Sequence, residues 1–401
     1  MNTESAQRLG QALVPLVADP PLWIHRIVES VSFIDAQTIR RARSFDFTVP
    51  EGTPQLDGRT IVPLALLARR VLSELDVCDD SGRRLPLLTS TQNGDVSAAL
   101  LWAIAEEGGI DDPEFLAALS RLPTREGGDL DHVLTLLNHR HAGQEVIDLA
   151  RALSTGFMVY ALCDTPPGHR SLIKLAYSEP LESAGARRDL SQLLGWAPLE
   201  VAFEVRAAGE AASYHFEVTA PTGGVVRAAS LAVATEDQHD VPNLPANQVA
   251  QSDDAGRLVH LHLNSVPRTS AGKVLAQVVP TRAGWLANAA FAAWSTAVIL
   301  VAAYVTRGRL SASPDSSVTL LLVSNGLISA VLGRPLSHDL TAVISRGPRR
   351  IALAAAVSSY TAAFVFVAGF QGATLGVALI ATWMVALVSA IALTRSWVNS
   401  G

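Results

Sequence analysis

Residues 285–305 form a run of 21 residues without a charged side chain. As an α-helix this run is about 31 Å long, which matches the roughly 30 Å hydrocarbon core of a lipid bilayer. Buried helices of soluble proteins usually carry charge on one face, and here whole helical turns carry none. The run therefore predicts a membrane-spanning helix, and the overall mean hydropathy of +0.27 agrees with a membrane protein.

The rest of the C-terminal region has the same character. Residues 351–394 are free of charge and are interrupted by Gln371-Gly372, which predicts two helices joined by a tight turn. The apolar run 318–332 is shorter, about 22 Å as a helix, and spans a bilayer only if flanking serines or a snorkelling Arg334 lengthen it. We therefore predict an α-helical multi-pass membrane domain of four transmembrane helices within 285–401, with spans at about 285–305, 316–334, 351–370 and 373–393.

The basic residues near these spans predict the orientation. One side of the four-span topology carries only Arg307 and Arg309, and the other side carries eight basic residues. Because loops rich in Lys and Arg stay in the cytoplasm, we expect a cell-membrane protein with both termini cytoplasmic, and the N-terminal sequence lacks an export signal. The eight residues are Arg268, Lys273, Arg282, Arg334, Arg346, Arg349, Arg350 and Arg395.

Charge and cysteine content exclude several classes of function. The apolar runs 285–305, 318–332, 351–370 and 373–393 contain no Asp, Glu, Lys, Arg or His, which argues against pumps and coupled transporters. Residues 1–284 carry 24 basic and 35 acidic side chains, so we expect no nucleic-acid partner, because phosphates require positive charge. With two cysteines in 401 residues, the chain is not a disulfide scaffold.

Alternation of apolar and polar residues predicts a β-rich domain before the first span. For example, Phe45, Phe47 and Val49 share one face of a predicted strand, and Asp79–Gly82 would reverse the chain between strands 74–78 and 84–88. Short strands at this spacing are typical of antiparallel, β-sandwich-like folds. The other strands expected are 157–163, 171–177, 201–205, 214–219, 225–234, 258–263 and 274–279.

Residues 94–155 have a different, helical pattern. Apolar spacing predicts helices at 95–107 and 129–138 and one that begins near Pro113, and Gln144–Leu153 would end at a C-terminal Gly156. We therefore expect an α+β cytoplasmic domain followed by the membrane domain. Its parts are a β-rich N-terminal portion (1–93), a helical insertion (94–155) and an antiparallel β-sandwich-like portion (156–284), with the transmembrane domain at 285–401.

His260 and His262 are the candidate metal ligands. They lie two residues apart on a predicted strand whose other face is apolar, so both rings project to the polar side. His215 with Glu217, or His239 with Asp240, would have to complete the site, and an exposed strand face is the alternative explanation. We predict no cofactor.

No catalytic motif accompanies these histidines. The sequence has no HExxH, CxxC or GxSxG pattern, and Cys78 and Cys163 both resemble buried core residues. The hypothesis that remains is a non-catalytic binding or scaffold domain at the inner face of the membrane, with the lipid bilayer and another protein as partners. Two alternatives stay open: a channel gated by the domain, suggested by Asn325 and the polar residues 358–361, and an unrecognised metal-dependent hydrolase. Gly372 and Gly376 have the spacing of a helix-packing motif, which leaves a homo-oligomer through the membrane helices open.

Overall fold

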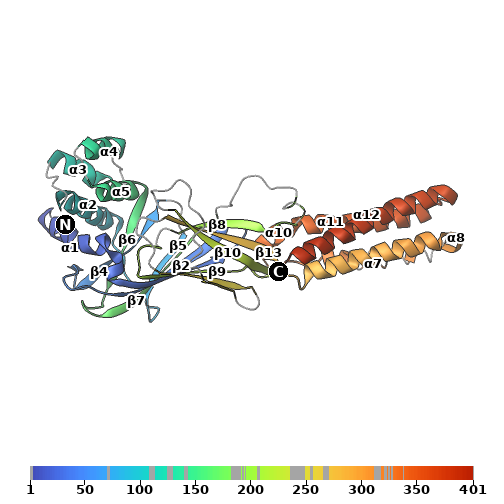
Figure 1. The fold of residues 1–401 in the computed structure, drawn as a ribbon, viewed down its shortest axis with the longest axis horizontal. Helices are drawn as coiled ribbons and strands as arrows, with labels where there is room; N and C mark the ends of the chain where they lie inside the picture. The colour runs from blue at the N-terminus through green and yellow to red at the C-terminus, as the bar shows by residue number, and fades with distance from the viewer. Residues whose placement is uncertain are drawn as a thin grey trace.

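The computed structural model describes most of the chain. The molecule is elongated, with the residues before Trp285, here called the extramembrane domain, at one end and a bundle of long helices at the other (Figure 1). The described residues are 3–69, 73–107, 113–123, 130–139, 143–181, 191, 194, 196–205, 208–234, 249–252, 256–264, 271–310, 318–319, 323, 326, 328–336 and 338–400.

A seven-stranded sheet forms the centre of the extramembrane domain. It draws strands from both sides of the helical region 94–155, so the two β-rich portions share one sheet. All neighbouring strands are antiparallel except β1 and β9, which pair in parallel. In spatial order the strands are β11 (Val249–Ser252), β12 (Leu258–Asn264), β9 (Ser213–Thr219), β1 (Ile24–Phe33), β2 (Thr38–Thr48), β7 (Arg170–Pro180) and β5 (Ser73–Asp79).

Two three-stranded sheets complete the β structure. Phe203 of the first lies 6.2 Å from Phe33 and 5.9 Å from Phe216 of the large sheet, ring centroid to ring centroid, and one continuous apolar core joins all three sheets. The structure confirms a mixed α/β domain, and a closed β-sandwich is not confirmed among the described strands. The first small sheet has the order β10 (Gly224–Ala234), β13 (Ala271–Pro280) and β8 (Leu199–Val205). The second has the order β3 (Gln55–Leu56), β4 (Arg59–Ala68) and β6 (Gly156–Cys163).

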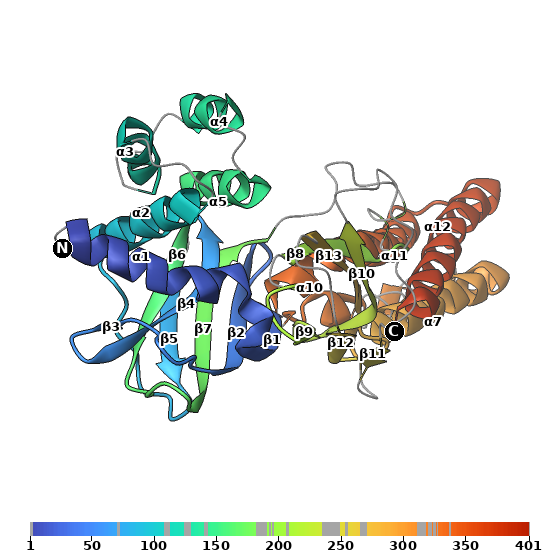
Figure 2. The ribbon, with the colours of Figure 1, turned by 60° about the vertical axis from the view of Figure 1, so that its left-hand side comes forward.

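Helices cover the sheet of β4 and β6 at the end remote from the bundle (Figure 2). The first helix, which the sequence analysis did not anticipate, crosses the second so closely that a Cβ on Gly10 would lie 2.2 Å from the Ala99 carbonyl oxygen. These elements are α1 (Thr3–Ala18), the short 3₁₀ helix η1 (Pro20–Leu22), α2 (Ser90–Glu107), α3 (Pro113–Arg121), α4 (Leu130–His139) and α5 (Gln144–Thr155).

One local expectation is confirmed and another needs correction. Helix α5 ends at Thr155 with Gly156 as its C-cap; this glycine is extended and begins β6, where a Cβ would lie 2.8 Å from the Leu67 carbonyl oxygen. Residues 84–88, in contrast, are not a regular strand. After the turn, this segment leaves β5 and crosses to β6, where Leu162 N donates to Pro86 O at 2.9 Å. The predicted hairpin is therefore cut short by the competing contact with β6.

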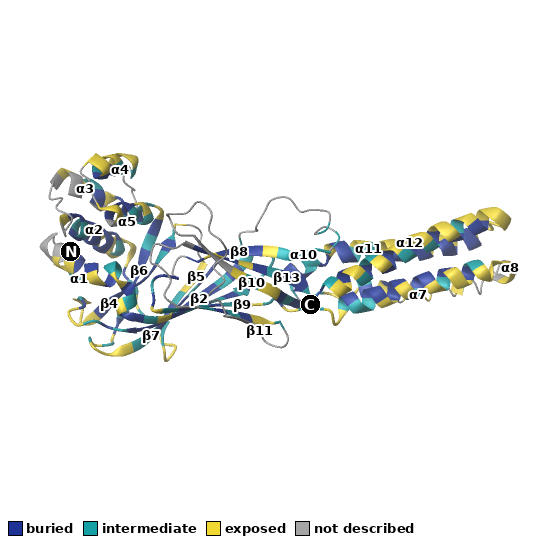
Figure 3. Ribbon diagram, in the orientation of Figure 1, coloured by how far each residue is buried: buried dark blue, intermediate teal, exposed yellow. Residues whose placement is uncertain are grey.

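Among the described residues, three helices are long and apolar enough to cross a membrane. They are α7 (Trp285–Val305), α11 (Arg346–Val367) and α12 (Gly372–Asn399). Small buried residues such as Ala293, Ala362 and Ala386 let the helices approach closely. Large apolar residues such as Phe291 and Phe364 are 70% and 67% exposed. Exposed and buried residues alternate along the helices of the bundle (Figure 3). Helices that face lipid typically show this distribution, with small residues buried between the helices and large apolar residues exposed.

We expected four spans, and the structure supports three. Most of the predicted span 316–334 lies outside the described residues; the part described includes helical residues 328–332, where Ile328 and Val331 are buried against Leu286 and Ala352 of the bundle. Its apolar run is also the shortest of the four, at about 22 Å of helix. α7 and the short α8 (Arg307–Leu310) lead away from the extramembrane domain, whereas the chain is back at that domain by His338.

The extramembrane domain and the end of α12 are bonded to each other. The short helix α10 (Asp339–Ile344) buries Leu340 in the core of the domain, and His338 Nε2 lies 3.1 Å from Phe33 O. At the C-terminal end of α12, the Arg282 guanidinium donates to Val398 O at 3.0 Å and to Ser400 O. The domain, α10 and the C-terminal end of the chain therefore lie at the same end of the bundle.

Candidate functional site

Strand β5, the last strand of the large sheet, is distorted near its start. Its pairing with β7 shifts register between Ser73 and Asp76, and Glu74 takes a φ of +56°, in the left-handed region that non-glycine residues rarely adopt. The Glu74 carboxylate accepts hydrogen bonds from Arg40 at 3.1 Å and Ser178 at 2.9 Å. The bulge leaves the next side chain, Leu75, 38% exposed. Such strain is characteristic of functional sites.

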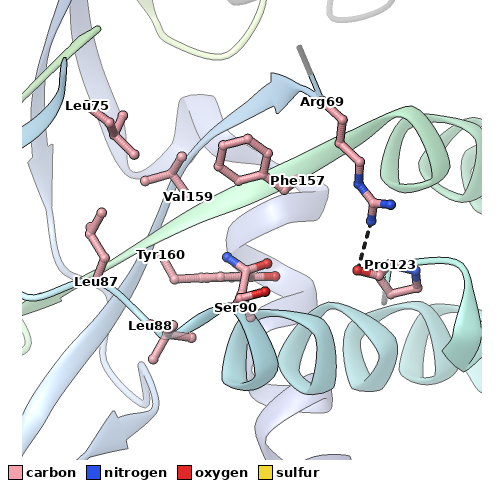
Figure 4. A pocket seen from close by; sticks show the side chains of 10 residues that line it. Arg69, Leu75, Leu87, Leu88, Ser90, Pro123, Phe157, Val159 and Tyr160 are labelled. Carbon is pink, nitrogen blue, oxygen red and sulfur yellow. Dashed lines mark hydrogen bonds between the residues drawn. The ribbon is translucent and has the colours of Figure 1, made fainter. Parts of the chain in front are cut away.

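Leu75 lies at the edge of an apolar pocket. The pocket has a volume of about 440 Å³, within the range of ligand-binding pockets, and its lining residues come from β5, β6, α2 and the segment after β5 (Figure 4). Arg69 closes one end and donates to Pro123 O at 2.8 Å and Gly156 O at 3.0 Å. The lining residues are Arg69, Leu75, Leu87, Leu88, Ser90, Asn93, Pro123, Phe157, Val159 and Tyr160.

A few polar groups mark one wall of this pocket. Asn93 Nδ2 donates to Met158 O, and Tyr160 OH lies 3.4 Å from Ser97 Oγ. Burial raises the pKa of Tyr160 to about 12, so the phenol stays neutral. Ser90, in the first turn of α2, is exposed at the rim. The wall therefore offers hydrogen-bonding groups to an occupant of the pocket.

A second hollow of about 490 Å³ adjoins the first and shares Leu75 and Leu87 with it. The rest of its lining is mostly charged and consists of Arg40, Glu74, Asp76 and Arg84 together with Val77 and Leu85. We call the two hollows together the distal groove. It runs past the bulge of β5 and has an apolar part and a charged part. The elements α2 and β6, which contribute to its apolar part, lie in the half of the extramembrane domain away from the bundle (Figure 1).

A buried charge network lies deeper in the domain. Glu29 is fully buried and pairs with Arg41 and, at 2.9 Å, with Arg43, and Tyr214 OH donates to it at 2.8 Å. Burial alone would raise the pKa of Glu29, but Arg43 and Arg41 lower it below its ordinary value. Arg41 also donates to Glu179 at 2.8 Å. Every charge in the network is paired inside the core, so we assign it to stability rather than to ligand binding.

The structure brings the predicted metal ligands together with His215. His215 Nδ1 lies 2.9 Å from His260 Nε2, Ser213 Oγ lies 3.2 Å from His262 Nε2, and the three rings are stacked. Burial, followed by His262 and His260, lowers the pKa of His215 to about 4. Among the described residues, no three His, Cys, Asp or Glu side chains are grouped so that they could hold an ion. The metal site at His260 and His262 therefore stays a prediction, and His239 and Asp240 lie outside the described residues.

Other candidates from the sequence lie away from the distal groove. Burial raises the pKa of the Cys163 thiol to about 12, which makes it a poor nucleophile. Ser358 and Thr361 donate to carbonyls of their own helix, at 2.7 Å and 2.8 Å, so they offer no argument for a pore, and Asn325 lies outside the described residues. Gly376 faces Tyr304 of α7 and Arg307 of α8 within the chain.

The distal groove was not predicted from the sequence. Its walls come from segments as far apart as Leu75 and Phe157, and the bulge at Glu74 depends on a backbone angle that no local sequence motif indicates. The available signal was the exposed Leu75, which lies in the strand 74–78 that we assigned to a hairpin.

Comparison with known proteins identifies no relative. No family model and no curated protein matches the chain. Among solved structures, native leukotriene A4 hydrolase from Saccharomyces cerevisiae is similar at a TM-score of 0.26 and 8% identity, over 64% of this chain and 30% of the hydrolase. Variants of M1 zinc metallopeptidases, one in complex with L-arginine and one from Deinococcus radiodurans, give TM-scores of 0.26 and 0.25 at 10% identity, over 94% of each chain. Similarities this low carry no argument about fold or function.

Proposed function

We propose that this chain is a membrane-anchored binding protein whose extramembrane domain, on the cytoplasmic side, holds an extended segment of a partner protein in the distal groove. The observation that carries the proposal is the pair of adjoining hollows, one apolar and one charged, on either side of the exposed Leu75. The proposed role is non-catalytic, because both carboxylates of the groove are engaged by arginines, Glu74 by Arg40 at 3.1 Å and Asp76 by Arg84 at 3.2 Å.

An extended peptide fits this groove for a physical reason. β5 is an edge strand, and among the described residues its free edge is covered from Val77 onward by the turn that contains Arg83 and Leu85. A partner strand can therefore align beside Ser73–Asp76 through main-chain hydrogen bonds, with alternate side chains entering the two hollows. The apolar part would take a large aliphatic or aromatic side chain, and Arg40, Glu74, Asp76 and Arg84 would select a neighbouring polar one.

Site-specific photo-crosslinking in native membranes tests this proposal. A photoreactive amino acid at position 75 of the full-length protein should give a discrete crosslinked species with one protein. The same amino acid at position 258 is the matched control, because Leu258 is 37% exposed and lies on β12, across the sheet from β5. A crosslink of equal yield from position 258 would contradict the proposal.

A blocking variant adds a second criterion. Ser90→Trp places an indole at the rim of the apolar hollow and should abolish the crosslink, whereas Thr91→Trp, on the next exposed residue of α2, should leave it intact. Native mass spectrometry of the purified protein distinguishes the other occupant. A small molecule that co-purifies with the wild type and is lost from Ser90→Trp would replace the protein partner by a small ligand.

A further inference from the structure

Four arginines gather where the extramembrane domain meets the bundle. Arg346, Arg349 and Arg350 lie in the first five residues of α11, and Arg334 joins them through a hydrogen bond from Arg349 Nη2 to Arg334 O at 2.8 Å. We call these four residues the junction cluster. Three of them are exposed and Arg349 is half-buried.

The cluster has no acidic partner within the part of the chain that the structure describes. No Asp or Glu oxygen there lies within ion-pair distance of any of the four guanidinium groups, although Arg346 lines a hollow together with Asp339 and Glu200. The position is also unfavourable in water. The N-terminus of a helix carries partial positive charge, and cations three and four residues apart on one helix face repel each other. Such an arrangement favours the binding of an anion.

Arg349 is held in a fixed orientation with a hydrogen-bond donor unused. Its guanidinium carbon lies 5.5 Å from the centroid of the Trp285 ring, and the Trp285 indole in turn donates to Val331 O at 2.8 Å. Arg349 Nε is buried and finds no acceptor among the described residues. A stacked guanidinium with a free donor is well suited to a phosphate, because its planar fork matches two phosphate oxygens.

The position of the cluster along the bundle identifies the source of the phosphate. Trp285 begins α7, and Trp397 lies in the last turn of α12 at the same end of the bundle. Tryptophan prefers the headgroup level of a bilayer, and the exposed apolar surface of the helices begins beyond it, at residues such as Phe291 and Leu353. The junction cluster therefore lies at the depth of lipid phosphates.

We infer that the junction cluster binds the phosphate of an anionic glycerophospholipid in the leaflet that faces the extramembrane domain. Arg349 supplies the oriented donors, and Arg334, Arg346 and Arg350 supply the surrounding charge. A zwitterionic headgroup carries its own ammonium group close to the phosphate, which reduces its attraction to four cations. The site therefore selects net negative headgroups such as phosphatidylglycerol.

Native mass spectrometry of the full-length protein in mild detergent, with phosphatidylglycerol or phosphatidylcholine added, tests the inference. We expect the wild type to bind phosphatidylglycerol more tightly by about tenfold. Combining Arg346→Gln, Arg349→Gln and Arg350→Gln should remove this preference. The matched control combines Arg307→Gln and Arg309→Gln at the other end of the bundle and should retain it. Equal binding of the two lipids by the wild type, or an unchanged preference in the triple variant, would overturn the inference.

Two further measurements separate a defined site from general attraction. Arg349→Lys keeps the charge but loses the planar fork, and it should lower the preference while the protein remains folded; an unchanged preference in this variant would overturn the assigned site. Millimolar inorganic phosphate should leave the bound lipid in place. Displacement of the lipid by phosphate would point to a soluble anion as the ligand and would also overturn the lipid assignment.

Discussion

Arginine is used differently in the extramembrane domain and at its junction with the bundle. In the domain, the buried Arg41 and Arg43 pair with Glu29, and on the surface Arg59 and Arg170 pair with aspartates at 3.1 Å and 2.7 Å. In the junction cluster, no arginine pairs with a carboxylate among the described residues. The domain thus neutralises its cations within its own fold, whereas the junction leaves them for the surroundings.

This difference indicates what each region depends on. Charges in the low-dielectric core of the domain are costly unless each has its partner, so the domain should be sensitive to single substitutions in the network. Three of the four charges in the junction cluster are exposed, so their replacement should alter lipid binding more than the stability of the fold. Three experiments can break or sharpen this comparison.

The largest effect should follow from Glu29→Gln. This change leaves Arg41 and Arg43 buried without their shared carboxylate, and we expect a loss of about 3–5 kcal/mol in the free energy of unfolding, because uncompensated buried charge is that costly. Denaturant unfolding of the full-length protein, followed by near-ultraviolet circular dichroism, measures the loss. The control is Asp164→Asn, an exposed partner of Arg59 and Arg83, where about 1 kcal/mol or less is expected. A similar small loss for Glu29→Gln would remove the distinction.

A smaller effect concerns His215, whose imidazole is kept in its neutral form by burial and has, among the described residues, no carboxylate partner of the kind that Arg41 and Arg43 have. Because its pKa is lowered to about 4 in the folded protein, the unfolded chain binds this proton more readily. Stability from this group is complete above its unfolded pKa of about 6.5 and falls as the pH drops toward 4; the loss is about 1 kcal/mol after allowing for solvent screening. His215→Gln should flatten the pH dependence of the unfolding midpoint between pH 7 and 4. His169→Gln, in an exposed turn, should leave it unchanged, and an unaltered slope in His215→Gln would refute the prediction.

The smallest effect should come from Arg282, which is bonded to main-chain carbonyls at the end of α12. Arg282→Gln removes a cation from a helix C-terminus and should cost about 0.3–1 kcal/mol. The change should be local, so hydrogen exchange at Val398–Ser400 should accelerate while the core of the domain is unaffected. Arg257→Gln, an exposed change near β12, serves as the control. Faster exchange throughout the domain would show that the two regions are coupled more tightly than the comparison implies.

The membrane helices were the most predictable part of the fold. The run 285–305 coincides with α7, because a charge-free stretch of this length rarely forms anything other than a membrane-spanning helix. Helix α11 begins at Arg346, before the predicted start at 351, and helix α12 ends at Asn399, after the predicted end at 393. These ends lie beyond the apolar runs because helices continue into the headgroup region, where charge is tolerated.

The central strands were harder to predict for an identifiable reason. β1 was missed and β2 was recognised only from Ser44 onward, because Glu29, Arg41 and Arg43 occupy core positions where apolar residues are expected. Ion pairs between neighbouring strands cannot be recognised from the alternation of residues along a single strand. β4 was not predicted, because it is buried on both faces and contains Pro63 and therefore shows no alternation of apolar and polar residues.

The parallel pairing of β1 with β9 has a consequence for biosynthesis. β1 ends at Phe33 and its neighbour begins at Ser213, so at about 5–20 residues per second the ribosome needs roughly 10 to 40 s to deliver that neighbour. Throughout this interval, Glu29 lacks the Tyr214 hydroxyl and one edge of β1 is open. β12, which extends the sheet beyond β9, ends at Asn264, shortly before Trp285 begins the first membrane helix. The seven-stranded sheet therefore becomes complete at nearly the moment when the insertion machinery must engage the nascent chain.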